Sequence, residues 1–264
     1  LAGLGTRLLP LSSVIPKELL PINGKPNLEY IMEECIQAGI KQFIFVVPKN
    51  RPSIKKYFFN DIFYKKIIKK KKNDKRLKEI FKRIKRYQKM IKFVYQNRPE
   101  GTGHAVLQCK KYLKGTHFLM LLADDLIVKK NCSKEMIALH KRTKSSVIAT
   151  KSVERKTVSR WGILGFKNKT KNSFLINKVI EKPKISEAPS NFAIIGRYIL
   201  PKKIMNEIKK VKPGKGNEIH ITDAIKNLIK NGNTFFGKLF KGQYLDCGTL
   251  SGYMESTIKI NKRN

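Results

Sequence analysis

The sequence predicts an α/β fold, with a mostly parallel sheet flanked by helices. Two apolar runs, at residues 42–47 and 118–122, are nearly continuous, as in strands that are buried on both faces. Segments with apolar residues at helical spacing, such as 28–38 and 133–143, alternate with these runs. A regular alternation of strand and helix is typical of parallel sheets that carry helices on both faces.

The remaining elements follow from the same two periodicities. The predicted helices cover residues 28–38, a short segment from Ser53, 103–113, 133–143, 201–210, 220–231 and a last segment from about 249. The predicted strands cover residues 42–47, 92–95, 118–122, 147–152, 162–166, 174–180, 192–199 and 234–240. We expect a single domain over residues 1–264, with residues 153–190 as a small lobe inserted over the sheet.

A Lys-rich segment of low complexity interrupts this pattern at about residues 65–92. Its apolar side chains recur at spacings of three and four, at Leu77, Ile80, Phe81, Ile84 and Tyr87. This spacing predicts an amphipathic helix with a solvated basic face. A contact with nucleic acid is the alternative explanation for the same lysines.

The formal net charge of +38 has two explanations. One is nucleic-acid binding, and the other is a bias toward residues that A/T-rich codons encode. Basic and aromatic residues do not alternate regularly and no RNA-binding motif appears, so we favour the bias and expect no specific nucleic acid. We find no apolar run of about 18 residues, so no membrane partner is expected. The four scattered cysteines suit a reducing cytoplasm.

The beginning of the chain has the composition of a phosphate-binding loop. Gly3 and Gly5 frame one residue, and glycines let backbone N–H groups approach an anion. Arg7 adds a planar fork suited to phosphate oxygens, and Lys17 follows ten residues later. Leu8 stands where a dinucleotide fingerprint needs its third glycine, and the Gly-Lys-Ser/Thr of a P-loop is absent. The stretch therefore indicates a triphosphate site.

Together with later motifs, this stretch resembles the sugar-phosphate nucleotidyltransferases, most closely the bacterial uridylyltransferases that act on glucose 1-phosphate. The motifs are residues 1–26, 96–104, Asp124-Asp125, Glu181-Lys182-Pro183, 190–198, 216–225 and Asp246-Cys247-Gly248. The resemblance implies a Rossmann-like fold of the nucleotide-diphospho-sugar transferase type. It implies that UTP and glucose 1-phosphate give UDP-glucose and pyrophosphate by in-line attack on the α-phosphate. It also implies Mg²⁺ as cofactor and a homo-oligomer, either a dimer or a tetramer.

The resemblance also assigns the site residues. The catalytic residues it implies are Arg7, Lys17 and Lys182, and the metal ligands are Asp124 and Asp246. Nucleotide-binding residues are Ala2, Gly3, Gly5, Thr6, Gln96 and Gly101, and sugar-binding residues are Gly162, Glu181 and Asn191. Asp124 follows an apolar run, at the end of a strand where open α/β sheets bind ligands. A turn or helix cap remains the alternative role for each isolated Asp. We do not assign His104 as a base, because the attacking phosphate needs no deprotonation.

Two further expectations concern the beginning of the chain and rival activities. In the family a hydrophobic strand runs into the glycine loop, whereas Leu1 and Ala2 alone precede Gly3, so we expect that this amino-terminal strand is missing. The closest rivals transfer thymidylyl or guanylyl groups, but the motifs around Lys17 and residues 101–104 match the uridylyl enzymes better. A retired scaffold that binds RNA would be expected to lose its acidic residues, yet both metal-ligand candidates remain.

Overall fold

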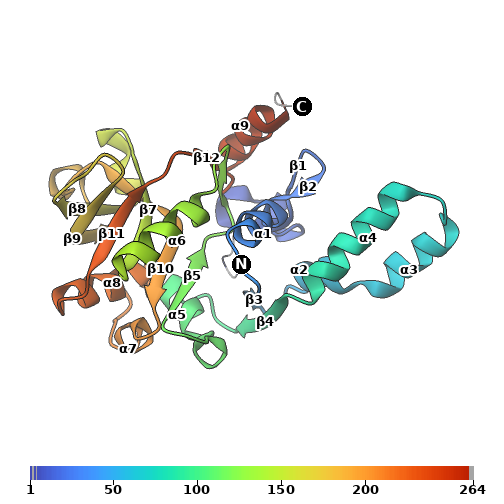
Figure 1. Cartoon of the computed structure of the whole chain (residues 1–264), viewed down its shortest axis with the longest axis horizontal. Helices are drawn as coiled ribbons and strands as arrows, with labels where there is room; N and C mark the ends of the chain where they lie inside the picture. The colour runs from blue at the N-terminus through green and yellow to red at the C-terminus, as the bar shows by residue number, and fades with distance from the viewer. Residues whose placement is uncertain (2, 4, 262–264) are drawn as a thin grey trace.

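The computed structural model describes residues 1, 3 and 5–261, and its largest element is a six-stranded sheet (Figure 1). The strand order is β5 (His117–Leu121), β10 (Phe192–Pro201), β7 (Ser146–Ser152), β11 (Phe235–Leu239), β9 (Ser173–Glu181) and β8 (Gly162–Lys167). Helices pack on both faces of this sheet, so the predicted α/β class is confirmed.

The direction of the strands is mixed and not mostly parallel as expected. In the six-stranded sheet β7 and β11 are parallel, whereas β10 runs antiparallel to both β5 and β7. A second parallel pair, β3 (Phe43–Pro48) with β4 (Ile91–Gln96), forms a separate sheet. Strand β10 is buried along its whole length because helices cover both faces, so its sequence looks like that of a parallel strand.

The two faces of the sheet carry different helices. Helix α6 (Cys132–Thr143) covers one face, and α5 (Thr102–Leu107), α7 (Ile204–Ile208) and α8 (Ile221–Lys230) cover the other (Figure 1). Successive residues of β7 alternate between them, since Val147 and Ala149 pack in the cluster of α6 and Ile148 in the cluster of α8. The predicted helices 103–113 and 201–210 are shorter than expected, and the first continues as a 3₁₀ turn, Lys110–Tyr112.

A second core lies under the beginning of the chain. Helices α1 (Asn27–Gln37) and α2 (Ser53–Phe59) pack there on β3 and β4. Two short pairs that the sequence pattern did not predict frame this region: β1 (Pro21–Ile22) with β2 (Lys25–Pro26), and β6 (Asp125–Val128) with β12 (Gln243–Asp246). Helix α9 (Leu250–Asn261) follows β12. The four strands β1, β2, β6 and β12 have only two to four residues each, which is too few for the alternation of a strand to be recognised in the sequence.

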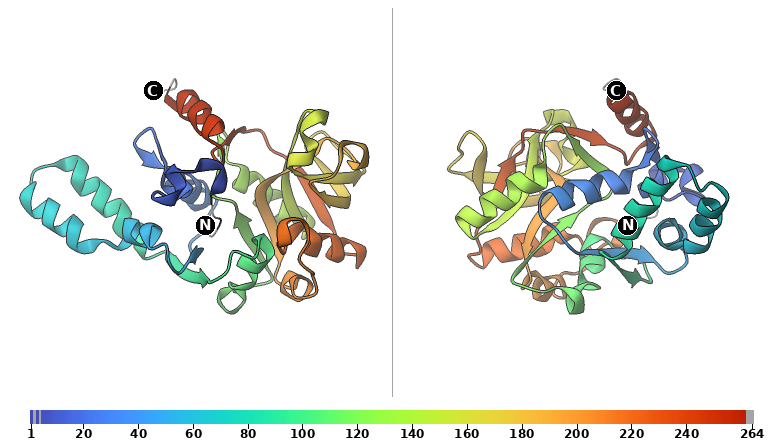
Figure 2. Two further views of the ribbon diagram at one scale, coloured as in Figure 1. Left: turned by 180° about the vertical axis from the view of Figure 1, so that it is seen from behind. Right: turned by 45° about the vertical axis from the view of Figure 1, so that its right-hand side comes forward.

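The Lys-rich segment is a helical hairpin that projects from the body (Figures 1 and 2). It contains two helices, α3 (Asp61–Lys70) and α4 (Lys75–Gln88), where one was predicted. The chain turns between them because the Asp74 side chain accepts a hydrogen bond from Leu77 N at 3.0 Å and caps α4. Helix α4 buries Ile84 and Tyr87, as the predicted stripe requires, and α3 buries no residue.

The expected lobe at residues 153–190 continues the sheet instead of covering it. Its strands β8 and β9 pair with each other, and β9 pairs with β11 at the end of the sheet. The glycine loop is not part of the six-stranded sheet, and the described residues before Thr6 form no strand. No helix in the described part of the chain is long and apolar enough to cross a bilayer.

Candidate active site

The glycine loop begins the site with a left-handed turn. Gly5 has a φ of 70°, and its carbonyl oxygen accepts hydrogen bonds from Leu8 N at 2.9 Å and Ser12 Oγ at 2.8 Å. A Cβ atom on Gly5 would lie 3.1 Å from Ser12 Cβ, so both the φ angle and the space favour glycine. Thr6 and Arg7 follow in a 3₁₀ turn and are exposed. The predicted nucleotide contact Ala2 lies outside the described residues.

Lys17 brings a cation to the first of the two predicted metal ligands. Its Nζ lies 2.6 Å from Asp124 Oδ2, and both side chains are largely buried. Burial disfavours charge on both groups, but their mutual attraction outweighs it. The pKa of Lys17 is therefore raised and the pKa of Asp124 is lowered, which keeps the pair ionised.

The second predicted metal ligand meets the first beside Gly248. Asp246 Oδ1 accepts a hydrogen bond from Gly248 N at 2.8 Å. A Cβ atom placed on Gly248 would lie 2.8 Å from Asp124 Oδ2 and 3.2 Å from Asp246 Oδ1. The two carboxylates thus converge on one point, although 122 positions separate them in the sequence (246 − 124). Only a residue without a side chain leaves that point open.

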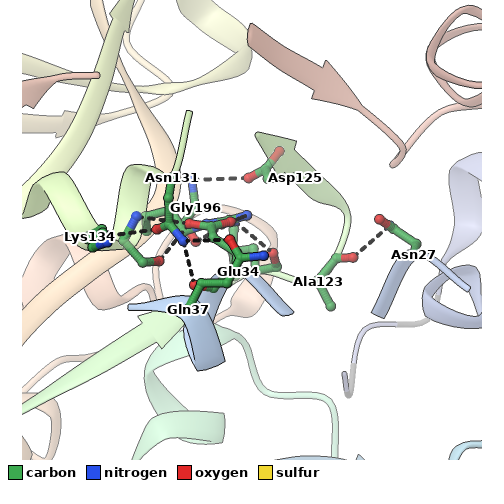
Figure 3. Close-up of polar contacts among 11 residues, drawn as sticks. Asn27, Glu34, Gln37, Ala123, Asp125, Asn131, Lys134 and Gly196 are labelled. Atoms are coloured by element: carbon green, nitrogen blue, oxygen red, sulfur yellow. Dashed lines mark hydrogen bonds and ion pairs between the residues drawn. The ribbon is translucent and has the colours of Figure 1, made fainter. Parts of the chain in front are cut away.

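The loop that carries Asp124 is fixed from several sides. Leu122 N donates to Gly196 O at 2.7 Å, Asn27 Nδ2 donates to Ala123 O at 2.7 Å, and Cys247 N donates to Asp124 O at 2.8 Å. Asp125 Oδ2 accepts from Gly196 N at 3.0 Å (Figure 3). Backbone groups held by strands and helices therefore determine where the Asp124 carboxylate lies.

A buried ion pair supports this loop from beneath. Arg197 Nη2 lies 2.9 Å from Glu34 Oε2, and Arg197 Nη1 donates to Leu122 O at 3.3 Å. Glu34 Oε1 also accepts from Ser133 N and Ser133 Oγ at 3.0 and 2.6 Å, at the beginning of α6. The pair joins α1, α6 and β10, and Arg197 is completely buried.

The neighbouring Asp125 is held in a different environment. Its Oδ1 accepts a hydrogen bond from the Tyr244 hydroxyl at 2.5 Å. Burial and the nearby negative charge of Asp124 raise the pKa of Asp125 to about 6. Lys151 Nζ lies 3.8 Å from the centre of the Tyr244 ring, which places a cation close to these acids. The two adjacent carboxyl groups are therefore inequivalent.

The predicted base-binding residues lie at the beginning of α5. Gln96 ends β4 and is buried, and its Nε2 lies 2.9 Å from His104 Nδ1. His104 Nε2 lies 2.8 Å from Gln108 Nε2. The imidazole is thus held between two amides, which suits a positioning role and not that of a base. Gly101 has a φ of 95° and directly precedes α5.

The predicted sugar-binding residues lie where β8 and β9 pair. Gly162 is the partner of Glu181, and a Cβ atom on Gly162 would lie 3.1 Å from Glu181 Oε2. Glu181 Oε1 lies 3.8 Å from Lys182 Nζ, and Lys182 adopts a φ of 44° directly after β9. Asn191 is exposed, and its Nδ2 donates to Ser152 Oγ of β7 at 3.0 Å. Thr222 Oγ1, which had no assigned role, donates to Glu181 Oε2 at 3.0 Å.

The structure therefore joins several predicted residues and adds others. It brings together Lys17, Asp124 and Asp246 at one point, and Gly162 and Glu181 at another. The sequence patterns did not indicate the supporting pair of Arg197 and Glu34. A signal existed for Arg197, because it is the one charged residue in the otherwise apolar strand β10.

Known proteins resemble the chain over nearly its full length. The family model described as nucleotidyl transferase matches residues 1–263. The UTP–glucose-1-phosphate uridylyltransferases of Pseudomonas aeruginosa and Streptococcus pyogenes are 36% and 34% identical to the chain; each match covers 97% of this chain, and 92% and 85% of the respective relative.

Solved structures give the same result. A UDP-glucose pyrophosphorylase complexed with UDP-glucose has a TM-score of 0.88 at 33% identity, over 100% of this chain and 97% of the other. A UTP-bound UGPase from Acinetobacter baumannii also has a TM-score of 0.88, at 31% identity, over 100% of this chain and 92% of the other. This chain belongs to the nucleotidyl transferase family.

Proposed function

We propose that this chain transfers the uridylyl group of UTP to glucose 1-phosphate, releasing pyrophosphate and forming UDP-glucose. The observation that carries the proposal is the meeting of Lys17, Asp124 and Asp246 beside Gly248. The glycine loop is close by, since a Cβ atom on Gly3 would lie 4.0 Å from Lys17 Nζ. The names of the relatives, and the UDP-glucose and UTP in the similar structures, support the choice of substrates.

The reaction needs charge neutralisation and alignment, because two polyanions must meet. An oxygen of the sugar phosphate forms a bond to the α-phosphorus of UTP, and the bond from that phosphorus to the pyrophosphate oxygen breaks. Arg7 and Lys17 hold the departing pyrophosphate, and Lys182 holds the incoming phosphate. No side chain becomes covalently attached, and no side-chain base is required.

The carboxylates of Asp124 and Asp246 fit a site for Mg²⁺. Magnesium prefers hard oxygen ligands and is commonly held by one or two carboxylates together with phosphates and water. The lowered pKa of Asp124 keeps one such ligand ionised, and Gly248 leaves space where the two carboxylates converge. When bound, Mg²⁺ would neutralise phosphate charge during the transfer.

The remaining assigned residues bind the two substrates. Backbone N–H groups of the loop around Gly3, Gly5 and Thr6 contact the triphosphate. Gln96 and the backbone at Gly101 read the uracil ring by hydrogen bonds. Glu181 accepts hydrogen bonds from sugar hydroxyls, and Gly162 leaves room for it. Asn191 donates to Ser152 Oγ through its Nδ2, and its Oδ1 accepts a hydrogen bond from the sugar.

The test is Asp124→Asn, with Glu79→Gln, an exposed carboxylate of the projecting hairpin, as the control. UDP-glucose formation from UTP and glucose 1-phosphate is measured over a range of Mg²⁺ concentrations. Loss of metal neutralisation removes several kcal/mol of transition-state stabilisation, so kcat of the Asp124 variant should fall roughly 100-fold or more. The control should keep the parental rate. An Asp124→Asn variant with near-parental turnover contradicts the proposal.

We also propose that the enzyme is a homo-oligomer, a dimer or tetramer, that works in the cytoplasm. Helix α9 exposes three apolar side chains at a spacing of four, Leu250, Met254 and Ile258, each more than half exposed. The four cysteines are free and buried, which suits a reducing compartment. Light scattering should give a mass of two or four chains, and Met254→Ser should lower it. A monomer at micromolar concentration contradicts the assembly.

A further inference from the structure

We propose that residues 219–222, which lead into α8 and include its first two residues, form a strap that couples the base loop to Glu181, with Thr102 and Thr222 as positioning residues. The inference rests on the proposed function, in which residues 96–103 receive uracil and Glu181 receives the sugar. The strap follows both subsites in the sequence and forms hydrogen bonds to each of them. It therefore gives a physical route by which binding at one subsite affects the other.

On the base side, the strap is attached to the loop by three hydrogen bonds. Ile219 N donates to Glu100 O at 2.9 Å, Gly103 N donates to Ile219 O at 2.7 Å, and Ile221 N donates to Thr102 Oγ1 at 3.1 Å. The last of these satisfies a backbone N–H at the beginning of α8, where the helix itself supplies no acceptor.

The two segments also pack without space between them. A Cβ atom on Gly101 would lie 2.7 Å from Ile219 O, and one on Gly103 would lie 2.9 Å from the same oxygen. Both distances are shorter than a van der Waals contact allows, so the glycines are needed for this approach. Because the backbones touch, the loop cannot shift independently of the strap.

On the sugar side, the next residue of the strap holds Glu181. Thr222 is only 4% exposed, and its Oγ1 donates to Glu181 Oε2 at 3.0 Å. The Thr222 methyl group lies against Gly162, 3.4 Å from the position of a Cβ atom there. With Oε2 held in this way, Oε1 is the oxygen that lies toward Lys182, at 3.8 Å.

The strap is rigid enough to transmit a displacement. Ile221 and Ile225 of α8 are buried in the main core, which anchors the helix behind the strap. Thr102 is bonded to Ile221 and Thr222 to Glu181, so the two contacts are one residue apart along a single helical turn. A hydroxyl that orients a carboxylate in advance removes rotamers that the sugar would otherwise have to restrict.

The first test compares Thr222→Val, which removes the hydroxyl at nearly constant shape, with Thr222→Ser, which retains it. A hydrogen bond to a charged group is lost in the Val variant, so KM for glucose 1-phosphate should rise roughly tenfold or more. KM for UTP should change less than about twofold, since Gln96 and Gly101 are untouched. Thr222→Ser should stay near the parental value. Equal kinetics of the Val and parental enzymes overturn the role of Thr222.

The second test asks whether Thr222 acts through Glu181. In a Glu181→Gln background, Thr222→Val should raise KM for glucose 1-phosphate little further, because the hydrogen bond between the two side chains is already altered. If the effects of the two substitutions on KM multiply fully, Thr222 does not act through Glu181. Should Thr222→Val fail to fold, Thr222→Ala provides the same comparison. A parental chain that forms no UDP-glucose contradicts the proposed function, whereas an active parent with an unaffected Val variant contradicts the strap alone.

The third test addresses the coupling itself. Thr102 contacts the strap and is on the base side, so Thr102→Val should raise KM for glucose 1-phosphate as well as KM for UTP, while Thr102→Ser should restore both. In the Thr102→Val/Thr222→Val double variant, the fold-increase in KM for glucose 1-phosphate should be smaller than the product of the two single-variant increases. A Thr102→Val variant that changes only the UTP parameters overturns the coupling.

Discussion

Replacing Arg197 by Met tests how far the site depends on its buried ion pair. The change removes the only cation within hydrogen-bonding distance of Glu34 among the described residues. Glu34 remains buried, at 6% side-chain exposure, with hydrogen bonds from Ser133 but no counter-charge. Breaking a buried pair by removing one partner costs about 3–5 kcal/mol, because a desolvated charge remains.

This magnitude is large compared with the stability of a domain, which is about 5–15 kcal/mol. At roughly 2–4 °C per kcal/mol for a chain near this size, Tm should fall by about 6–20 °C. Urea unfolding followed by circular dichroism gives the free energy directly, provided that the transition is two-state. Loss of the Arg197 contact to Leu122 O should also lower kcat, because Leu122 belongs to the loop that carries Asp124.

Two further variants separate the ion pair from simple packing. Lys238→Met breaks the pair of Lys238 with Glu135, whose side chains are 12% and 21% exposed, and should cost less. The double variant Glu34→Gln/Arg197→Met removes the stranded charge and should be more stable than Arg197→Met alone. The stabilising role of the ion pair is refuted if Arg197→Met lowers the free energy of unfolding by less than about 1 kcal/mol. It is also refuted if the double variant loses as much free energy as the two single variants together.

Three other outcomes are expected. Gln96→Ala should weaken the use of UTP by about 1–3 kcal/mol in kcat/KM, because buried polar groups lose a partner, and an unchanged preference for UTP over other nucleotides would contradict it. Lys182→Ala should raise KM for glucose 1-phosphate and lower kcat with little change in UTP affinity, whereas a purely UTP-specific defect would speak against its assignment. RNA binding by the basic hairpin at residues 61–89 should be weak and should disappear with added salt, as filter binding can measure; tight, sequence-selective binding at physiological salt would overturn the compositional explanation.

Local patterns were sufficient where one periodicity dominates a long segment. The predicted strands at 118–122 and 147–152 and the helix at 133–143 correspond to β5, β7 and α6 within about one residue. In the hairpin the apolar stripe predicts only α4, because α3 buries no residue, and Asp74 caps α4 after the turn. Strand direction cannot be predicted from such patterns, since burial on both faces gives the antiparallel strand β10 the same apolar sequence that a parallel strand would have.

By itself, the sequence determined the α/β class, the glycine loop and the identity of the charged residues, because these depend on neighbouring side chains or on motifs a few residues long. Only the tertiary structure decided which of them meet. Asp124 and Asp246 converge because β6 pairs with β12, and Thr222 reaches Glu181 because α8 packs against β9. Arg197 and Glu34 acquire their role only when β10, α1 and α6 are packed together. Contacts between residues 41 to 163 positions apart follow from chain topology and packing, which no local period encodes.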